Sequence, residues 1–187
     1  MRRLLQEEGI GEAAALEVER YSEELRQLTV ASGTEYAGMV DVDSGSRLGR
    51  TIRGSVSETD IRQHLNAMAA GHGYVQLHTH PRSAAFSWWD AALLLRFDSL
   101  QSMVVIGSDR RRFLLSRNPE VPQAKPEDVQ RMWAVTFRNH WRNLSDGQIE
   151  DMSDGEVEAM TQVVTQAMWP ELAADLGLRY AEIEGFP

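Results

Sequence analysis

The 187 residues of this chain include no cysteine. Disulfides, thiol nucleophiles and thiolate metal sites are therefore excluded, and a metal would have to bind through histidine and carboxylate side chains. The sequence also lacks an apolar run near the roughly 20 residues of a membrane-spanning helix. The N-terminal MRRLLQEEGIGEAAALEVER reaches acidic residues too early for a signal peptide. We therefore expect a cytoplasmic protein that does not bind a membrane.

Basic residues are scarce, and the formal net charge is -9. From Asp151 to the C-terminus there are eight acidic residues and one base, Arg179, which accounts for seven of the nine excess charges. Such a segment repels phosphate backbones, so we expect no nucleic-acid partner. A solvated helix face is the simpler reading of these acids, and an acidic surface for a partner is the alternative.

Hydrophobic residues make up 42% of the chain and charged residues 25%, which is typical of a globular protein. The length favours one core with helical additions. Periodicity and turn residues divide the chain into an N-terminal helix in residues 1–30, a core in residues 31–118 and a C-terminal helical extension in residues 119–187. The helices of this extension are candidates for closing a homodimer or for holding a partner protein.

Within the core, strands and helices alternate, which predicts a mixed α/β (α+β) fold. An amphipathic helix over about Glu7–Leu28 precedes the core. The predicted core elements are a hairpin of strands at 35–42 and 48–53, a helix from Ser57 or Thr59 to about Ala70, a strand at 74–77, a helix at 88–97 with Ser87 as N-cap, and strands at 103–106 and 112–115. Helices opening at Pro126 and Ser153 form the extension.

The stretch HTHPRSAAFSWWD carries the most chemistry. His78 and His80 close the strand and point to the same side of it, because side chains alternate with period two. Asp90, in the first turn of the next helix, can return its carboxylate to them as a third ligand. Two imidazoles and a carboxylate, with a fourth position for water, form the ligand set of a hydrolytic zinc site.

Two strand histidines can also be hydrogen-bonded at a surface without a metal, so this pair alone is a weak signal. The wider pattern is more specific, because Pro81 follows His80 and Ser87 stands three residues before Asp90. This pattern resembles the JAMM (MPN+) family of zinc metalloproteases, whose signature is an upstream glutamate, H-x-H-P, and a serine three residues before an aspartate. The resemblance covers about Thr34 to Arg117.

The upstream glutamate lies far from the histidines in the sequence and is an independent check. In the family it begins an early core strand and is followed by a glycine and apolar residues. Glu35 fits this form in the stretch EYAGMV, whereas Glu58 lies at a helix start, and Glu12 and Glu24 lie in an acidic helix. We therefore expect Glu35 to be the family's glutamate.

The resemblance implies a mixed sheet core flanked by helices, with the layering of cytidine deaminases. It also implies Zn²⁺ bound by His78, His80 and Asp90, with Glu35 as general base toward the metal-bound water and proton carrier to the leaving amine. Ser87 would donate a hydrogen bond to the developing oxyanion, or serve only as the helix N-cap.

Two features depart from the family pattern. Nine residues separate His80 from Asp90 where eukaryotic members typically have ten, which resembles bacterial and phage-associated branches. Arg82 and Ser83 also replace a glycine that often follows the proline. The zinc hypothesis therefore depends most on whether this shorter loop lets the Asp90 carboxylate reach the histidines.

The implied reaction is peptide or isopeptide cleavage beside the C-terminal tail of ubiquitin or a ubiquitin-like protein, or of an ordinary peptide. An extended tail would add to a strand edge, such as that of the hairpin at 35–53. The main alternative is a metal-free scaffold with this fold. Two other hydrolase classes fit the sequence less well. An amidohydrolase barrel also uses a strand-end H-x-H, but it needs about 250 residues. A serine triad is disfavoured because the sequence has no G-x-S-x-G elbow.

Overall fold

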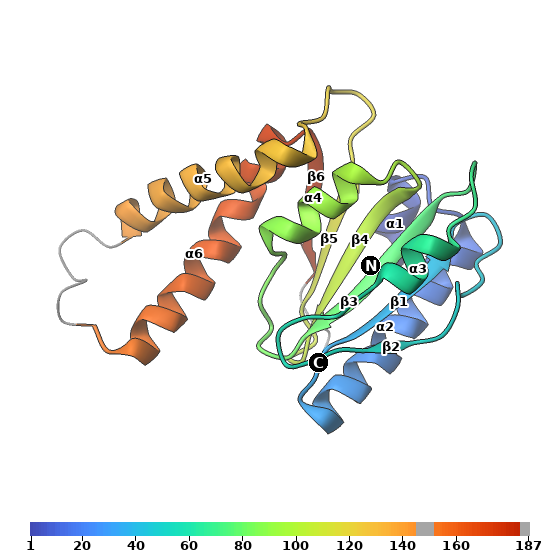
Figure 1. The fold of residues 1–187 in the computed structure, drawn as a ribbon, viewed down its shortest axis with the longest axis horizontal. Helices are drawn as coiled ribbons and strands as arrows, with labels where there is room; N and C mark the ends of the chain where they lie inside the picture. The colour runs from blue at the N-terminus through green and yellow to red at the C-terminus, as the bar shows by residue number, and fades with distance from the viewer. Residues whose placement is uncertain (145–151, 184–187) are drawn as a thin grey trace.

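Six strands pair into one mixed sheet in the order β2-β1-β3-β4-β5-β6 (Figure 1). The computed structural model describes residues 1–144 and 152–183. Among the described strands, β3 and β4 run parallel and the other neighbouring pairs are antiparallel. The strands are β1 (Tyr36–Asp41), β2 (Ile52–Arg53), β3 (Tyr74–His80), β4 (Leu100–Gly107), β5 (Arg112–Arg117) and β6 (Leu178–Ile183). The predicted mixed α/β fold, a sheet flanked by helices, is therefore confirmed.

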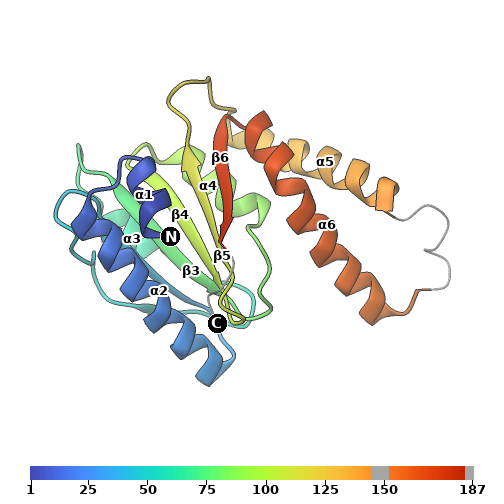
Figure 2. The same ribbon diagram turned by 180° about the vertical axis from the view of Figure 1, so that it is seen from behind.

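Helices cover both faces of this sheet. Helices α1 (Arg2–Glu7) and α2 (Glu12–Ser32) lie on one face, which Figure 2 shows from the front. Helices α3 (Arg62–Ala67) and α4 (Trp88–Arg96) lie on the opposite face (Figure 1). Alternation along β3 sends Val75 and Leu77 into the core beneath α2 and leaves the even-numbered residues, including both histidines, on the α4 side.

The N-terminal region contains two helices instead of the single helix predicted over Glu7–Leu28. Gly9, at φ 82°, takes a left-handed conformation between them, and Gly11 is the N-cap of α2. Helix α2 then packs so closely on β1 that a Cβ at Gly38 would lie 2.2 Å from the Tyr21 ring. The glycine of the EYAGMV stretch is thus required by helix-to-sheet packing.

The hairpin and the helix after it are shorter than predicted. Strand β2 covers only Ile52–Arg53 of the predicted 48–53, although it does pair antiparallel with β1. Helix α3 begins at Arg62, and its N-cap residue, Ile61, provides no side-chain cap. The predicted caps were wrong, because the Thr59 hydroxyl instead donates to Glu35 Oε2 at 3.2 Å. Thr59, predicted as a helix N-cap, therefore contacts a residue of the site described below.

The C-terminal extension contains a short 3-10 turn at Pro126–Asp128, α5 (Val129–Leu144) and α6 (Asp154–Asp175). Ser153 forms a capping box with Glu156 at the start of α6, as its position predicted. The prediction of a helical extension was incomplete, because residues 178–183 form β6 and pair with β5. Residues 145–151 and 184–187 of the extension lie outside the described part of the chain.

The α5–α6 hairpin reaches out beyond the sheet in both views (Figures 1 and 2). The C-terminal half of α6 is anchored, since Met168, Trp169 and Leu172 are fully buried in the same core as α4. Within the described residues, no helix combines the length and apolar character needed to cross a membrane. The extension is thus a packed part of the fold at one end and a projecting arm at the other.

Candidate metal centre

Strand β3 places the two histidines at its C-terminal end, on the face covered by α4. His78 Nε2 and His80 Nε2 lie 3.1 Å apart. The His78 side chain is only 7% exposed. The predicted pincer of two imidazoles on one side of the strand is therefore present in the structure.

Asp90 reaches this pair from the first turn of α4. Its Oδ1 lies 3.4 Å from His78 Nε2, and its side chain is 14% exposed. The backbone N–H and the hydroxyl of Ser87 each donate to Asp90 Oδ2 at 2.7 Å. In return, Asp90 N–H donates to Ser87 Oγ at 3.3 Å, which completes a capping box. The short loop from His80 thus brings the carboxylate to the histidines and leaves its Oδ1 directed at them.

Ser87 is the N-cap that the sequence predicted. Its single hydroxyl proton is directed to Asp90 Oδ2 in this arrangement. The side chain therefore orients a prospective metal ligand. The oxyanion-stabilising role stays a prediction, because it requires the same proton to turn toward substrate.

Both imidazoles are held from behind by hydrogen bonds at Nδ1. His78 Nδ1 lies 3.0 Å from Gln76 Oε1, and the Gln76 amide N–H₂ donates to Leu77 O at 2.9 Å, which fixes the orientation of the amide. His80 Nδ1 lies 3.0 Å from Ala84 O. Since both neighbours of Nδ1 are acceptors, Nδ1 carries the proton in each neutral ring and Nε2 presents a lone pair. Metal-binding histidines in proteins are oriented in this way.

The spacing of the three inward atoms is close to that around one tetrahedral cation, since all lie within 4.8 Å of one another. Ligand atoms about 2.0 to 2.2 Å from a shared Zn²⁺ lie roughly 3.3 to 3.6 Å from each other, and the two distances given above are 3.1 and 3.4 Å. Two neutral imidazole lone pairs that face each other at this range repel unless a proton or a metal cation lies between them. Nitrogen and carboxylate donors suit Zn²⁺, so His78, His80 and Asp90 could hold it.

The electrostatics keep two of these groups in the form that binds metal. Burial, reinforced by the charge of His78, lowers the pKa of His80 to about 4. Burial opposes the charge of Asp90, but the two histidines and Ser87 outweigh it and hold its pKa below the usual value. Burial also opposes protonation of His78, yet the charges of Asp90 and Glu35 raise its pKa. At neutral pH His80 is therefore neutral and Asp90 charged.

Glu35, which precedes β1, lies on the same face of the sheet. In the antiparallel register Ala37 pairs with His78, so Glu35 and Ala37 belong to the face that carries the histidines. The Glu35 residue is 6% exposed, and burial raises the pKa of its carboxyl group, while the charge of His78 lowers it in part. The backbone N–H of Glu35 donates to Ser55 O at 2.7 Å, and its carbonyl oxygen accepts from Gly54 N–H at 2.9 Å. The structure therefore brings the distant glutamate into the electrostatic field of the predicted ligands.

Side chains from outside the signature hold the loop between His80 and Asp90. Trp169 of α6 is fully buried, donates its indole N–H to Phe86 O at 2.9 Å, and packs edge-on against the Phe86 ring. Ser83 takes a left-handed conformation with φ 57°, at the place where the family often has glycine. Its hydroxyl accepts from Asp109 N–H at 3.2 Å, so the β4–β5 turn supports the strained residue.

Sequence reasoning missed three of these contacts. Gln76 carried a readable signal, because a polar residue two positions before His78 in an apolar strand must share its face. Thr59 looked like a helix cap, and Trp169 lies 83 positions from the residue that it holds. Only the first could have been recognised from local pattern.

The remaining histidines do not join this centre. His64 is buried, and its Nε2 lies 2.9 Å from Arg50 O. His140 forms a pair with Glu171 on the outer helices. His72 lies with Asp41 and Asp43 in a second, surface cluster. The structural or surface roles expected for these three histidines agree with their positions.

Comparisons of the chain with protein-family models, with curated proteins and with solved structures found no match. What this centre can do must therefore be argued from its own geometry.

Proposed function

We propose that the chain is a zinc-dependent peptidase of the JAMM type, which hydrolyses a peptide or isopeptide bond. The observation that carries the proposal is the convergence of His78, His80 and Asp90, with the buried Glu35 on the same face of the sheet. Glu35 is the glutamate that the family resemblance selects, and it lies more than 40 residues before the histidines in the sequence. The charge of His78 lowers the pKa of Glu35 in part, and that of Asp90 raises it. A buried carboxylate beside a set of nitrogen and oxygen ligands suits hydrolysis better than structural metal binding.

The ligand set leaves room for water, and Zn²⁺ held there would lower the pKa of a bound water from about 15.7 toward about 7. Glu35 supplies the proton transfers. Thr59 holds Oε2 of the carboxylate, which leaves Oε1 to take a proton from the attacking water and deliver it to the leaving amine. Burial raises the pKa of Glu35, which favours a group that must both accept and release a proton near neutral pH.

We further propose that the substrate is the extended C-terminal tail of a ubiquitin-like protein or its conjugate. Strand β2 is at the edge of the sheet and pairs with β1. Glu35 lies immediately before β1 in the sequence. An extended chain that pairs with this edge would gain main-chain hydrogen bonds close to the catalytic carboxylate.

The test is a Glu35→Gln variant assayed with fluorogenic C-terminal amides of ubiquitin-like proteins and with short peptides. We expect the variant to retain zinc and to lose about 10² to 10⁴-fold in turnover, the usual contribution of a general base. Tyr36→Phe, a change at the neighbouring residue, is the control and should retain activity. Full turnover by the glutamine variant would overturn the assignment of Glu35.

A further inference from the structure

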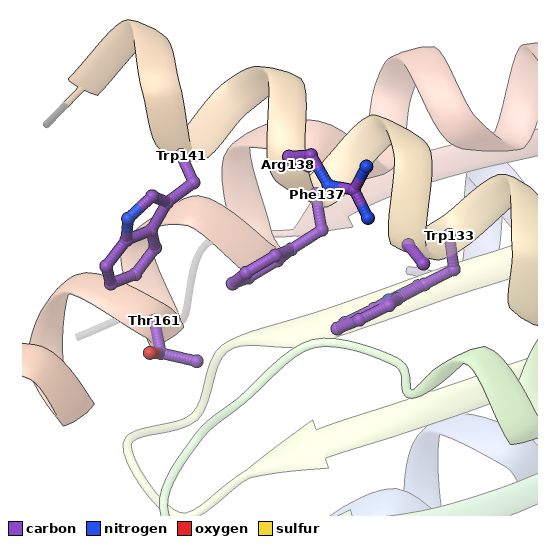
Figure 3. A pocket seen from close by; sticks show the side chains of 6 residues that line it. Trp133, Phe137, Arg138, Trp141 and Thr161 are labelled. Atoms are coloured by element: carbon purple, nitrogen blue, oxygen red, sulfur yellow. The ribbon is translucent and has the colours of Figure 1, made fainter.

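A second feature of the molecule lies on the projecting arm. Helix α5 carries three aromatic residues at intervals of four, so that their rings form a ladder along one side (Figure 3). The Trp133 and Phe137 rings stack with centroids 4.9 Å apart, and Phe137 and Trp141 with centroids 5.7 Å apart. We call the space beside this ladder the aromatic groove, which is lined by Trp133, Ala134, Phe137, Arg138, Trp141 and Thr161.

The aromatic groove has a volume of about 360 Å³, which is enough for large side chains of a bound segment. Its rings are only partly buried, unlike Trp169 at the anchored end of α6, which is fully buried. Aromatic surface that stays partly exposed along one side of a helix is of the kind that marks interaction sites. Trp133 and Phe137 pack in part against the core, whereas Trp141 lies outside the core cluster, so core packing accounts for only part of the ladder.

The charge on α5 indicates what the groove would accept. Helix α5 contains Arg131, Arg138 and Arg142 and no acidic residue, in a chain whose net charge is -9. Arg131 pairs with Asp128. Arg138 and Arg142 have no hydrogen bond or ion pair to any residue in the described part of the chain. A cationic, aromatic helix in an acidic protein is complementary to an acidic partner.

The groove also adjoins the loop that leads to the metal centre. Thr161 of α6 lines the groove, and the next residue, Gln162, donates its side-chain N–H₂ to Arg82 O at 3.2 Å. Glu158, one turn earlier on α6, forms an ion pair with the Arg82 side chain. Arg82 lies two residues after His80, so one helix contacts both the occupant of the groove and the loop between the predicted ligands.

We propose that the aromatic groove binds an acidic protein segment that carries a large apolar side chain. The apolar side chain lies against the rings of Phe137 and Trp141, and carboxylates flanking it pair with Arg138 and Arg142. Binding requires no turnover, so this site stands whether or not the metal centre is a peptidase. If both are correct, the groove holds a protein partner next to the centre that acts on it.

The experiment uses the full chain and labelled 12-residue peptides in fluorescence anisotropy. One peptide set places a single Phe or Leu between runs of glutamate, and the matched set replaces each glutamate with lysine. We expect the glutamate set to bind at least about tenfold more tightly than the lysine set. The preference should decrease as salt is added, because it rests on exposed charges.

Arg138→Gln should weaken binding of the glutamate peptides about tenfold, and Phe137→Ala by at least as much, as truncation of a central anchor does. Arg50→Gln removes an exposed arginine on the sheet side of the molecule and should have no effect. Thermal unfolding of each variant identifies losses due to folding, and Arg138 is exposed, so its variant keeps the fold. The proposal fails if both peptide sets bind equally or if Arg138→Gln binds like wild type. It also fails if sedimentation shows a dimer that Arg138→Gln dissociates, since the occupant is then a second copy.

Discussion

Two clusters of histidine and aspartate lie at opposite ends of β3. One consists of His78, His80 and Asp90, and the other consists of Asp41, Asp43 and His72. In each cluster the possible ligand atoms lie within 4.8 Å of one another, so distance alone does not separate them. They differ in what holds each side chain from behind.

In the first cluster every side chain is fixed by an atom other than the one that faces the centre. Gln76 Oε1 and Ala84 O are hydrogen-bonded to Nδ1 of His78 and of His80, and Ser87 donates to Oδ2 of Asp90. The inward atoms are two Nε2 lone pairs and a carboxylate Oδ1, which have no donor among them when both rings are neutral. This arrangement is the one that a bound cation would require.

In the second cluster the side chains satisfy each other. His72 Nδ1 itself bonds Asp41 Oδ2 at 3.0 Å, and Asp41 Oδ1 accepts from Ser44 N–H at 2.8 Å within a turn. The His72 and Asp43 side chains are 49% and 66% exposed. This is a turn with a surface ion pair, so the two clusters differ in their supporting contacts more than in the spacing of their possible ligands.

The largest effect should come from Asp90. Asp90→Ala removes a ligand, and we expect zinc affinity to fall by more than the 10- to 100-fold typical of losing a supporting contact. Asp90→Asn keeps an oxygen that can accept from Ser87, so it should lose zinc while α4 stays capped. It should also lower the pKa of His78 in the metal-free protein, because the carboxylate charge raises that pKa. Isothermal titration with Zn²⁺ and NMR titration measure these effects, and zinc binding unchanged in both variants would contradict the assignment.

Gln76→Leu should produce the next largest effect. The leucine removes the acceptor that holds His78 Nδ1–H, and zinc affinity should fall about 10- to 100-fold. Gln76→Glu restores an acceptor at the same place and should bind zinc at least as well as wild type. Equal affinities for the leucine variant and wild type would show that His78 is not oriented through Gln76.

Trp169→Phe tests the support that α6 gives the loop. The phenylalanine keeps a ring against Phe86 but loses the indole hydrogen bond, a contact worth about 0.5 to 1.5 kcal/mol. Zinc affinity should fall about two- to tenfold. The control is Tyr180→Phe, because the Tyr180 hydroxyl is buried without a partner in the described residues and its ring stacks on Trp169. If both variants bind zinc like wild type, α6 does not position the loop.

His72→Ala should have the smallest effect. The lost pair with Asp41 is at the surface, so unfolding should change by no more than about 0.5 kcal/mol and zinc stoichiometry should be unaffected. Chemical denaturation and zinc titration of the same sample measure both. A drop in the number of zinc ions bound would mean that the second cluster is also a site and that the comparison drawn above is wrong.

The sequence was sufficient for features that depend on local pattern. Alternation in β3 placed the two histidines together, and the Ser87 cap placed Asp90 in the first turn of α4. Glu35 was chosen because the family resemblance calls for a glutamate at a strand start followed by a glycine, and the structure shows that packing on Tyr21 requires this glycine. These features follow from one or two neighbouring residues.

Features that depend on distant partners were not predictable. Residues 178–183 form a strand because β5 offers an edge for pairing, and nothing in that segment alone distinguishes it from the end of a helix. Thr59 donates to Glu35 instead of capping α3. Trp169 contacts Phe86 through tertiary packing, since the two residues lie 83 positions apart in the sequence. In each case the structure is determined by tertiary contacts that the local sequence does not reveal.

The most direct test of the metal centre is the zinc content of the purified chain after metal removal and reloading, compared with that of His78→Ala. We predict one tightly bound zinc ion per wild-type chain and none in the variant, while His72→Ala retains one. Zinc absent from the wild type, or held equally by His78→Ala, would contradict the claim that His78, His80 and Asp90 form a metal site.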